Sequence, residues 1–165
     1  LNMLEKHVNS TPEVENVEIF IRPEGTLSLQ ISERQPLFKV VSDPPFFSDA
    51  KGALFAFKTL DSVHYPEFQT TSPTLFVRPT AALISTLKTD PFLKRELNSV
   101  SVKNNQYQLR LKSYDFVVVF GTPTRIQEKI KKLKVFCAFQ NVQDSLARYQ
   151  KINLSYKKQV VASTF

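Results

Sequence analysis

The residue types that perform most enzymatic and metal chemistry are scarce in this sequence. Its 165 residues include one cysteine, Cys137, and two histidines, His7 and His64. One cysteine cannot form an intrachain disulfide, and so few, widely spaced ligands do not match a metal-binding motif. No Gly-x-Ser-x-Gly, His-Glu-x-x-His or phosphate-loop pattern occurs either. We therefore expect no catalytic residue, no metal ion and no cofactor, with a paired-carboxylate site as an open alternative.

A basic segment near the C-terminus could bind phosphates. Thr122 and Pro123 predict the N-cap and first residue of a helix. Apolar residues recur in it at helical spacing: Ile126, Ile130, Leu133 and Cys137. Basic residues lie elsewhere on this helix: Arg125, Lys129, Lys132 and Lys134. We expect a solvated basic face rather than a nucleic-acid site, because no aromatic residues are interleaved for stacking, and we expect a buried, inert Cys137.

The overall composition is that of a folded domain with a basic surface. Hydrophobic residues make up 42% and the net charge is +7, which suits an anionic partner without specifying it. No apolar run reaches the roughly 18 residues of a membrane span. Several aspartates precede expected turns or helices, where aspartate commonly caps backbone N–H groups: Asp43, Asp49, Asp61 and Asp90.

The C-terminal stretch offers backbone chemistry instead. Ile152, Leu154 and Tyr156 alternate with Asn153, Ser155 and Lys157, the period of a strand with one buried face, and a β-branched run follows over residues 159–162. A strand that closes a chain commonly lies at a sheet edge, where unpaired N–H and C=O groups can bind another chain. The alternative interpretation is an ordinary last strand whose lysines keep other chains from pairing with its edge.

The remaining pattern mixes strands and helices. It predicts a helix over residues 1–10, a hairpin of strands 17–21 and 27–32 around Gly25, and strands at 37–41, 46–48 and 53–57. Residues 58–79 are expected to be mostly loop with short extended pieces. Helices follow around Leu83–Leu87 and from Asp90–Pro91, then a three-strand meander over 100–102, 107–111 and 116–120, and helices from Pro123 and over 141–149. The fold class is therefore α+β, with a mixed or antiparallel sheet and flanking helices.

Four collinear stretches resemble the extracytoplasmic part of the FtsQ/DivIB family of bacterial cell-division proteins. They are residues 12–36 (a Pro-x-Val start with a Thr-Leu hairpin ending in Glu-Arg-x-Pro), 47–55 (Phe-Ser-Asp-Ala-Lys-Gly-Ala-Leu-Phe), 116–133 and 152–156 (Ile-Asn-Leu-Ser-Tyr). Asn153 and Ser155 depart from the aspartate and arginine usual in the last motif. The form of residues 158–162 resembles Bacteroidetes members most closely.

The resemblance implies a partial POTRA unit, helix plus β-hairpin, over residues 1–38 and a larger β domain over 39–165. It implies a non-enzymatic scaffold on the periplasmic face of the inner membrane at the division septum, anchored by one N-terminal helix that precedes this segment. The implied partners are FtsB- and FtsL-like proteins, bound by strand addition, with no nucleic acid and no small-molecule substrate. The implied partner-binding residues are Tyr156, Lys157, Lys158, Gln159, Val160 and Val161, with Lys158, Gln159 and Val160 expected in the last strand.

Three other functions stay open at this point. One is a POTRA-containing chaperone or accessory of outer-membrane protein assembly or transport, although such proteins usually carry tandem POTRA repeats and no second copy is found. Another is a wall-modifying hydrolase, which would need a polar cluster in a cleft. The third is nucleic-acid binding through the basic helix, which a filter-binding salt series would test.

Overall fold

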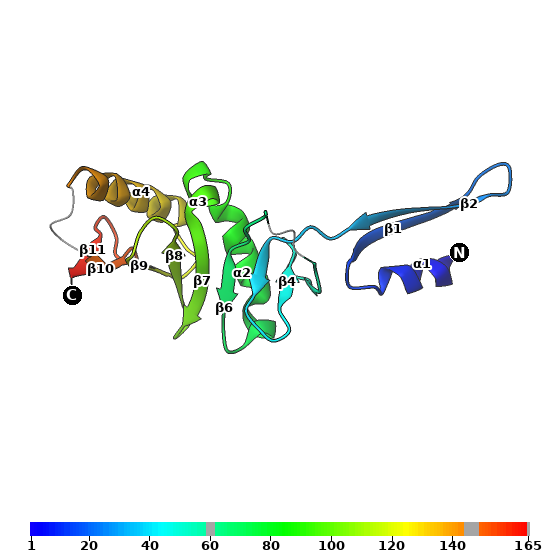
Figure 1. The fold of residues 1–165 in the computed structure, drawn as a ribbon, viewed down its shortest axis with the longest axis horizontal. Helices are drawn as coiled ribbons and strands as arrows, with labels where there is room; N and C mark the ends of the chain where they lie inside the picture. The colour runs from blue at the N-terminus through cyan, green and yellow to red at the C-terminus, as the bar shows by residue number, and fades with distance from the viewer. Residues whose placement is uncertain (59–61, 144–148, 165) are drawn as a thin grey trace.

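The computed structural model describes residues 1–58, 62–143 and 149–164, and it contains two sheets (Figure 1). The first sheet consists of the antiparallel strands β1 (Val14–Ile21) and β2 (Leu27–Glu33). Together with helix α1 (Asn2–Asn9) it forms an arm that extends away from the rest of the molecule. The second is a nine-stranded sheet that forms the body. The predicted helix and hairpin are confirmed, while the division into domains at residues 38 and 39 stays a prediction.

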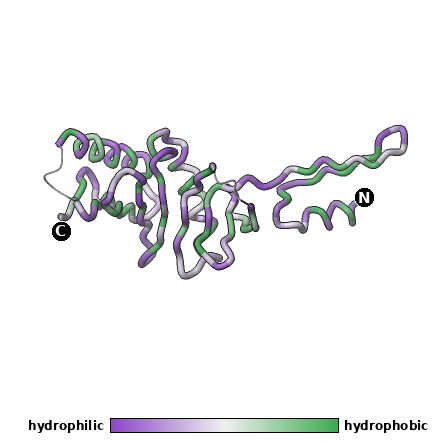
Figure 2. Tube along the Cα trace, viewed as in Figure 1, coloured by the Kyte–Doolittle hydropathy of each residue, from purple (hydrophilic) through white to green (hydrophobic). Residues whose placement is uncertain are grey.

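The hairpin of the arm follows from its sequence alternation and its turn. Gly25 has φ +83°, a conformation that costs glycine little, and it closes the turn between the strands. Val17 pairs with Ile31 and Ile19 with Leu29, so apolar side chains lie opposite one another across the two strands. Figure 2 shows hydrophobic and hydrophilic residues alternating along this arm.

The body sheet has the order β11-β10-β9-β8-β7-β6-β3-β4-β5. Its strands are β3 (Phe38–Val40), β4 (Phe46–Ser48), β5 (Leu54–Phe55), β6 (Glu67–Gln69), β7 (Leu97–Lys103), β8 (Gln106–Leu111), β9 (Val117–Gly121), β10 (Tyr149–Asn153) and β11 (Val161–Thr164). The pairs β3–β6, β6–β7 and β9–β10 are parallel and the other pairs antiparallel. The sheet is therefore mixed, which confirms the predicted α+β class.

In the described part of the chain, three helices accompany this sheet: α2 (Pro73–Leu87), α3 (Pro91–Glu96) and α4 (Ile126–Val142). Side chains of α2 and α4 share one hydrophobic cluster with those of the central strands, among them Leu83, Ile84, Leu87, Val100, Leu109, Val118, Phe120, Ile130 and Leu133. Burial of this cluster is the main source of stability of the body, because each large apolar side chain contributes roughly 1.5–3 kcal/mol when removed from water.

Several local predictions are confirmed in detail. Asp90 caps α3, with Oδ1 accepting hydrogen bonds from the N–H groups of Phe92 at 2.9 Å and Leu93 at 3.2 Å. Asn104 and Asn105, with φ of 51° and 57°, form the turn between β7 and β8. Phe116 and Val118–Phe120 are buried, as the continuous apolar run predicts, and Val117 is half-buried.

The start of α2 was predicted wrongly. Residues 58–79 were expected to be mostly loop, but the helix begins at Pro73 and passes through Pro79. A proline inside a helix removes one hydrogen bond and costs about 3 kcal/mol. Burial of Val77, Ala81 and further apolar residues of the same helix outweighs that cost.

The ends of α4 also differ from expectation. Thr122 does not cap the helix, because its hydroxyl pairs with that of Thr124 at 2.9 Å, and α4 begins only at Ile126 after Arg125 in the left-handed region (φ 51°). At the other end, α4 continues to Val142, and Tyr149 lies in β10 rather than in a helix. Residues 144–148 of the predicted helix, and Asp61, lie outside the described residues.

Lys129 contradicts the predicted solvated face most strongly, and Lys132, with 14% of its side chain exposed, departs from that prediction as well. The side chain of Lys129 is 1% exposed, with Nζ 2.7 Å from the carbonyl oxygen of Thr122 and 4.8 Å from the centre of the Phe120 ring. Burial is the largest cause that lowers the pKa of Lys129, and the neighbouring charges of Arg125 and Lys132 act in the same direction. The hydrogen bond and the cation–π contact compensate part of the free energy that Lys129 loses when its charge is removed from water. Helical periodicity could not reveal this burial.

Candidate partner-binding site

Strand β11 lies at the end of the body sheet. Its neighbour is β10, with Ala162 opposite Ile152 and Val161 opposite Asn153, and no other strand of the described residues pairs with it. Val161, Ser163 and Thr164 are exposed and Ala162 is half-buried. One side of β11 therefore presents backbone N–H and C=O groups that a strand of another chain can pair with.

The predicted partner-binding residues lie mostly in the loop before this strand. The expected alternation continues through Ile152 and Leu154, both fully buried, but Tyr156 is 49% exposed and belongs to no strand. Only Val161 of the predicted set is in β11, so the expectation that Lys158, Gln159 and Val160 sit in the last strand is wrong.

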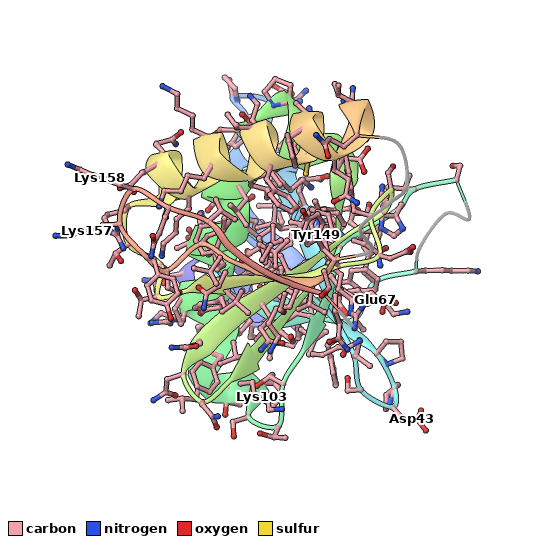
Figure 3. The ribbon with its side chains drawn as sticks, turned by 90° about the vertical axis from the view of Figure 1, so that its left-hand side faces the viewer. Asp43, Glu67, Lys103, Tyr149, Lys157 and Lys158 are labelled. Carbon is pink, nitrogen blue, oxygen red and sulfur yellow. The ribbon has the colours of Figure 1, made fainter. Side chains whose placement is uncertain are left out.

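Two local features turn the chain at this point. The side-chain oxygen of Asn153 accepts a hydrogen bond from the N–H of Ser155 at 2.9 Å, which closes an Asx turn directly after β10. Lys158 then takes φ 61° and reverses the chain toward β11. Figure 3 shows Lys157 and Lys158 at the outer end of this loop, with their side chains directed away from the body.

Cationic side chains of the α4 segment hold the loop through its carbonyl oxygens. Arg125 donates from Nη2 to the carbonyl of Ser155 at 2.7 Å, and Lys132 donates from Nζ to the carbonyl of Tyr156 at 2.6 Å. Arg125 directly precedes α4 and Lys132 lies seven residues later in the helix, and the two donate to the carbonyls of consecutive loop residues. The sequence analysis did not include Arg125 and Lys132 among the partner-binding residues. The seven-residue spacing of these two cations before the final strand could have indicated them.

Glu128 orients one of these cations. Its carboxylate lies 2.8 Å from Nζ of Lys132 and 3.4 Å from Arg125. The hydrogen bond from Lys132 is the largest cause of a lowered pKa at Glu128, which therefore stays ionised at neutral pH. The loop is thus attached to α4 by an acid–base cluster that lies at the surface.

The close approach of β9 to the loop requires a glycine. Gly121 ends β9 with φ +77°, and a Cβ at this position would lie 2.5 Å from Oγ of Ser155. Ser155 itself has a buried Oγ without a hydrogen-bond partner in the described part of the chain. Gly121 therefore allows the loop to pack against the end of β9.

The described residues hold no cluster typical of metal binding. They contain no group of three or more histidine, cysteine, aspartate or glutamate side chains placed to bind a metal. Cys137 is buried as predicted, and burial raises the pKa of its thiol to about 11, which keeps it protonated. Within residues 1–58, 62–143 and 149–164, no helix has the length and apolar character needed to cross a bilayer.

These features define an α+β domain whose sheet ends in an exposed strand beside a basic loop. A comparison with protein families matches residues 35–163 to the family described as FtsQ/DivIB, C-terminal related. The chain belongs to this family of cell-division proteins, whose members are non-catalytic scaffolds of division. No protein in a search of curated proteins matches the chain. The resemblance drawn from the four motifs is therefore confirmed at the level of the family, and the Bacteroidetes type stays a prediction.

Proposed function

We propose that this chain is the periplasmic part of a single-pass inner-membrane protein of the division septum. In this proposal it is a scaffold without enzymatic activity that binds an FtsB–FtsL-like pair and helps to regulate septal wall synthesis. The partner adds one strand to β11, and residues 156–161 contact it. Membership of a division family supports the role in division, and the open edge of β11 supports the mode of binding.

The position of β11 in the sheet carries the proposal. Strand addition needs a strand with one unpaired side, and β11 has β10 on one side and no described strand on the other. Main-chain hydrogen bonds would fix the register of the partner, and alternate side chains would select its sequence. Lys157 and Lys158 would meet acidic partner residues, and each exposed pair would add roughly 0–1 kcal/mol.

Two adjacent proline variants test the strand addition. Successive N–H groups of a strand point to opposite sides, so one of Ala162→Pro and Ser163→Pro removes an inward N–H and the other an outward one. The inward variant lowers the melting temperature, which identifies it. The outward variant should keep the melting temperature and lower the affinity for the FtsB–FtsL extracytoplasmic segments at least tenfold, as measured by calorimetry.

Tyr156→Ala tests the contribution of the loop to partner binding, because it removes a half-exposed ring from the loop that precedes β11. We expect a three- to tenfold weaker complex at unchanged melting temperature, about 0.7–1.4 kcal/mol of binding energy. Unchanged affinity of both Tyr156→Ala and the outward proline variant would reject this site.

A further inference from the structure

A hydrophobic groove runs beside the edge strand and extends the surface described above. It lies between the outer face of α4 and the end of the loop, and its volume is about 500 Å³. Its apolar lining consists of Val135, Phe136, Phe139 and Val160. Lysines stand around it: Lys131, Lys132 and Lys158.

The apolar residues of α4 in this groove are unusual for the outer face of a helix. Val135 is 64% exposed and Phe139 47% exposed, although the opposite face of α4 already supplies the core with Ile130, Leu133 and Cys137. A helix that covers a sheet needs one apolar face, and a second apolar strip exposed to water gives the free domain no stability. Exposed apolar surface with a polar rim is typical of a protein-binding site.

The groove is continuous with the edge of the sheet. Val160 lines the groove, and the next residue, Val161, begins β11. A chain paired with β11 that continues past Val161 therefore reaches the groove within about one or two residues, at roughly 3.3 Å per residue. One partner chain can occupy both surfaces without a long connection.

The charges around the groove define the chemistry of its occupant. Lys131 and Lys158 are exposed on opposite sides, one on α4 and one on the loop. The acidic residue of the lining, Glu128, already pairs with Lys132 at 2.8 Å. The rim is therefore net positive and favours carboxylates, whereas the floor favours large aliphatic or aromatic side chains.

We propose that the groove binds the segment of the partner chain that directly adjoins the strand added to β11. This segment carries at least one large apolar side chain, which enters between Val135 and Phe139, and flanking Asp or Glu residues, which meet Lys131 and Lys158. The inference rests on the proposed strand addition and specifies the partner beyond it: an extended strand followed or preceded by an acidic, amphipathic segment.

The apolar contact is tested with Val135→Asp and Phe139→Asp in the whole chain. Leu75→Asp is the matched control, because Leu75 is 68% exposed on α2 and the change in charge is the same. We expect each groove variant to weaken binding of the FtsB–FtsL segments at least tenfold, with Leu75→Asp within twofold of the wild type. Phe139→Leu should stay within about threefold, because it keeps an apolar side chain. Circular dichroism melting checks that each variant is folded.

The charge contact is tested with the double variant Lys131→Glu, Lys158→Glu over a series from low to high salt. The wild-type affinity should fall as salt rises, and the double variant should bind more weakly and lose most of this dependence. A salt dependence that is the same in both proteins would overturn the acidic character of the occupant.

Different results would contradict the strand addition to β11 and the binding in the groove. If the outward proline variant abolishes binding while Val135→Asp and Phe139→Asp bind like Leu75→Asp, the strand addition stands and the groove proposal is wrong. If the groove variants weaken binding but neither proline variant does, the partner docks on α4 and the strand addition is wrong. Weaker binding of the outward proline variant, Val135→Asp and Phe139→Asp, with Leu75→Asp and Phe139→Leu close to the wild type, supports both.

Discussion

Lys132 and Tyr156 are joined by a hydrogen bond in which Nζ of the lysine donates to the main-chain carbonyl of the tyrosine at 2.6 Å. The bond links α4 to the loop that leads into β11, and only 14% of the Lys132 side chain is exposed. A hydrogen bond from a charged, mostly buried ammonium group is stronger than a hydrogen bond from water, so it restrains the carbonyl of Tyr156 more firmly. The position of the loop is therefore set by the helix as well as by the loop's own turn.

Lys132→Met should release this loop. The variant keeps the aliphatic stem but loses the donor, at a cost of about 1 kcal/mol, which corresponds to roughly fivefold faster opening. Hydrogen exchange of the free protein should show faster exchange over residues 155–160 and unchanged protection in β7 and β8. Lys132→Arg should retain most of the protection because it still donates. Equal protection in all three proteins would show that the bond does not restrain the loop.

Gly121→Ala should destabilise the body by about 2–3 kcal/mol. About 1–2 kcal/mol comes from a positive φ in an L residue, and the rest from the Cβ that would lie 2.5 Å from Oγ of Ser155. Ser155→Ala should be nearly neutral alone, because that hydroxyl is buried without a partner in the described residues. The double variant should recover about 1 kcal/mol in urea unfolding. Additive effects would contradict the steric explanation.

Asp49 makes the stability of the protein sensitive to acid. Burial alone would raise the pKa of Asp49, but hydrogen bonds from the N–H of Ala53, from Arg34 and from the N–H of Lys51 together hold it below its usual value of 3.8. The Arg34 guanidinium lies 2.7 Å from its carboxylate. This contribution to stability is therefore complete above about pH 4 and is lost as the pH falls through the lowered pKa of the folded state.

Asp49→Asn measures this contribution. At pH 7 it should lower the free energy of unfolding by about 1–3 kcal/mol, because it removes the negative charge opposite Arg34 and the oxygen Oδ2 that accepts the hydrogen bond from Arg34. Below about pH 4 the difference from the wild type should shrink, and it should disappear as the pH falls through the lowered pKa of Asp49, where the folded wild-type carboxylate becomes protonated. Asp43→Asn, at an exposed position, is the control and should differ little from the wild type at either pH. A difference independent of pH would contradict the linkage.

The sequence by itself determined the features that depend on near neighbours along the chain. Alternation predicted the hairpin of the arm and the meander of β7, β8 and β9, and Asp90–Pro91 predicted the start of α3. Each depends on a period or a cap within a few residues, which local sequence contains. The motif order also identified the family that the comparison with residues 35–163 supports.

Only the tertiary structure decided what these elements face. Lys129 is buried against the end of β9 and the turn that follows it. Arg125 and Lys132 bind carbonyl oxygens more than twenty positions away, and the groove lined by Val135 and Phe139 is completed by Val160 of the same distant loop. The alternation through Tyr156 could not show that the strand ends at Asn153. The order of strands in the sheet, and therefore which strands lie at its two edges, depends on how distant segments pack together, and no local period records that.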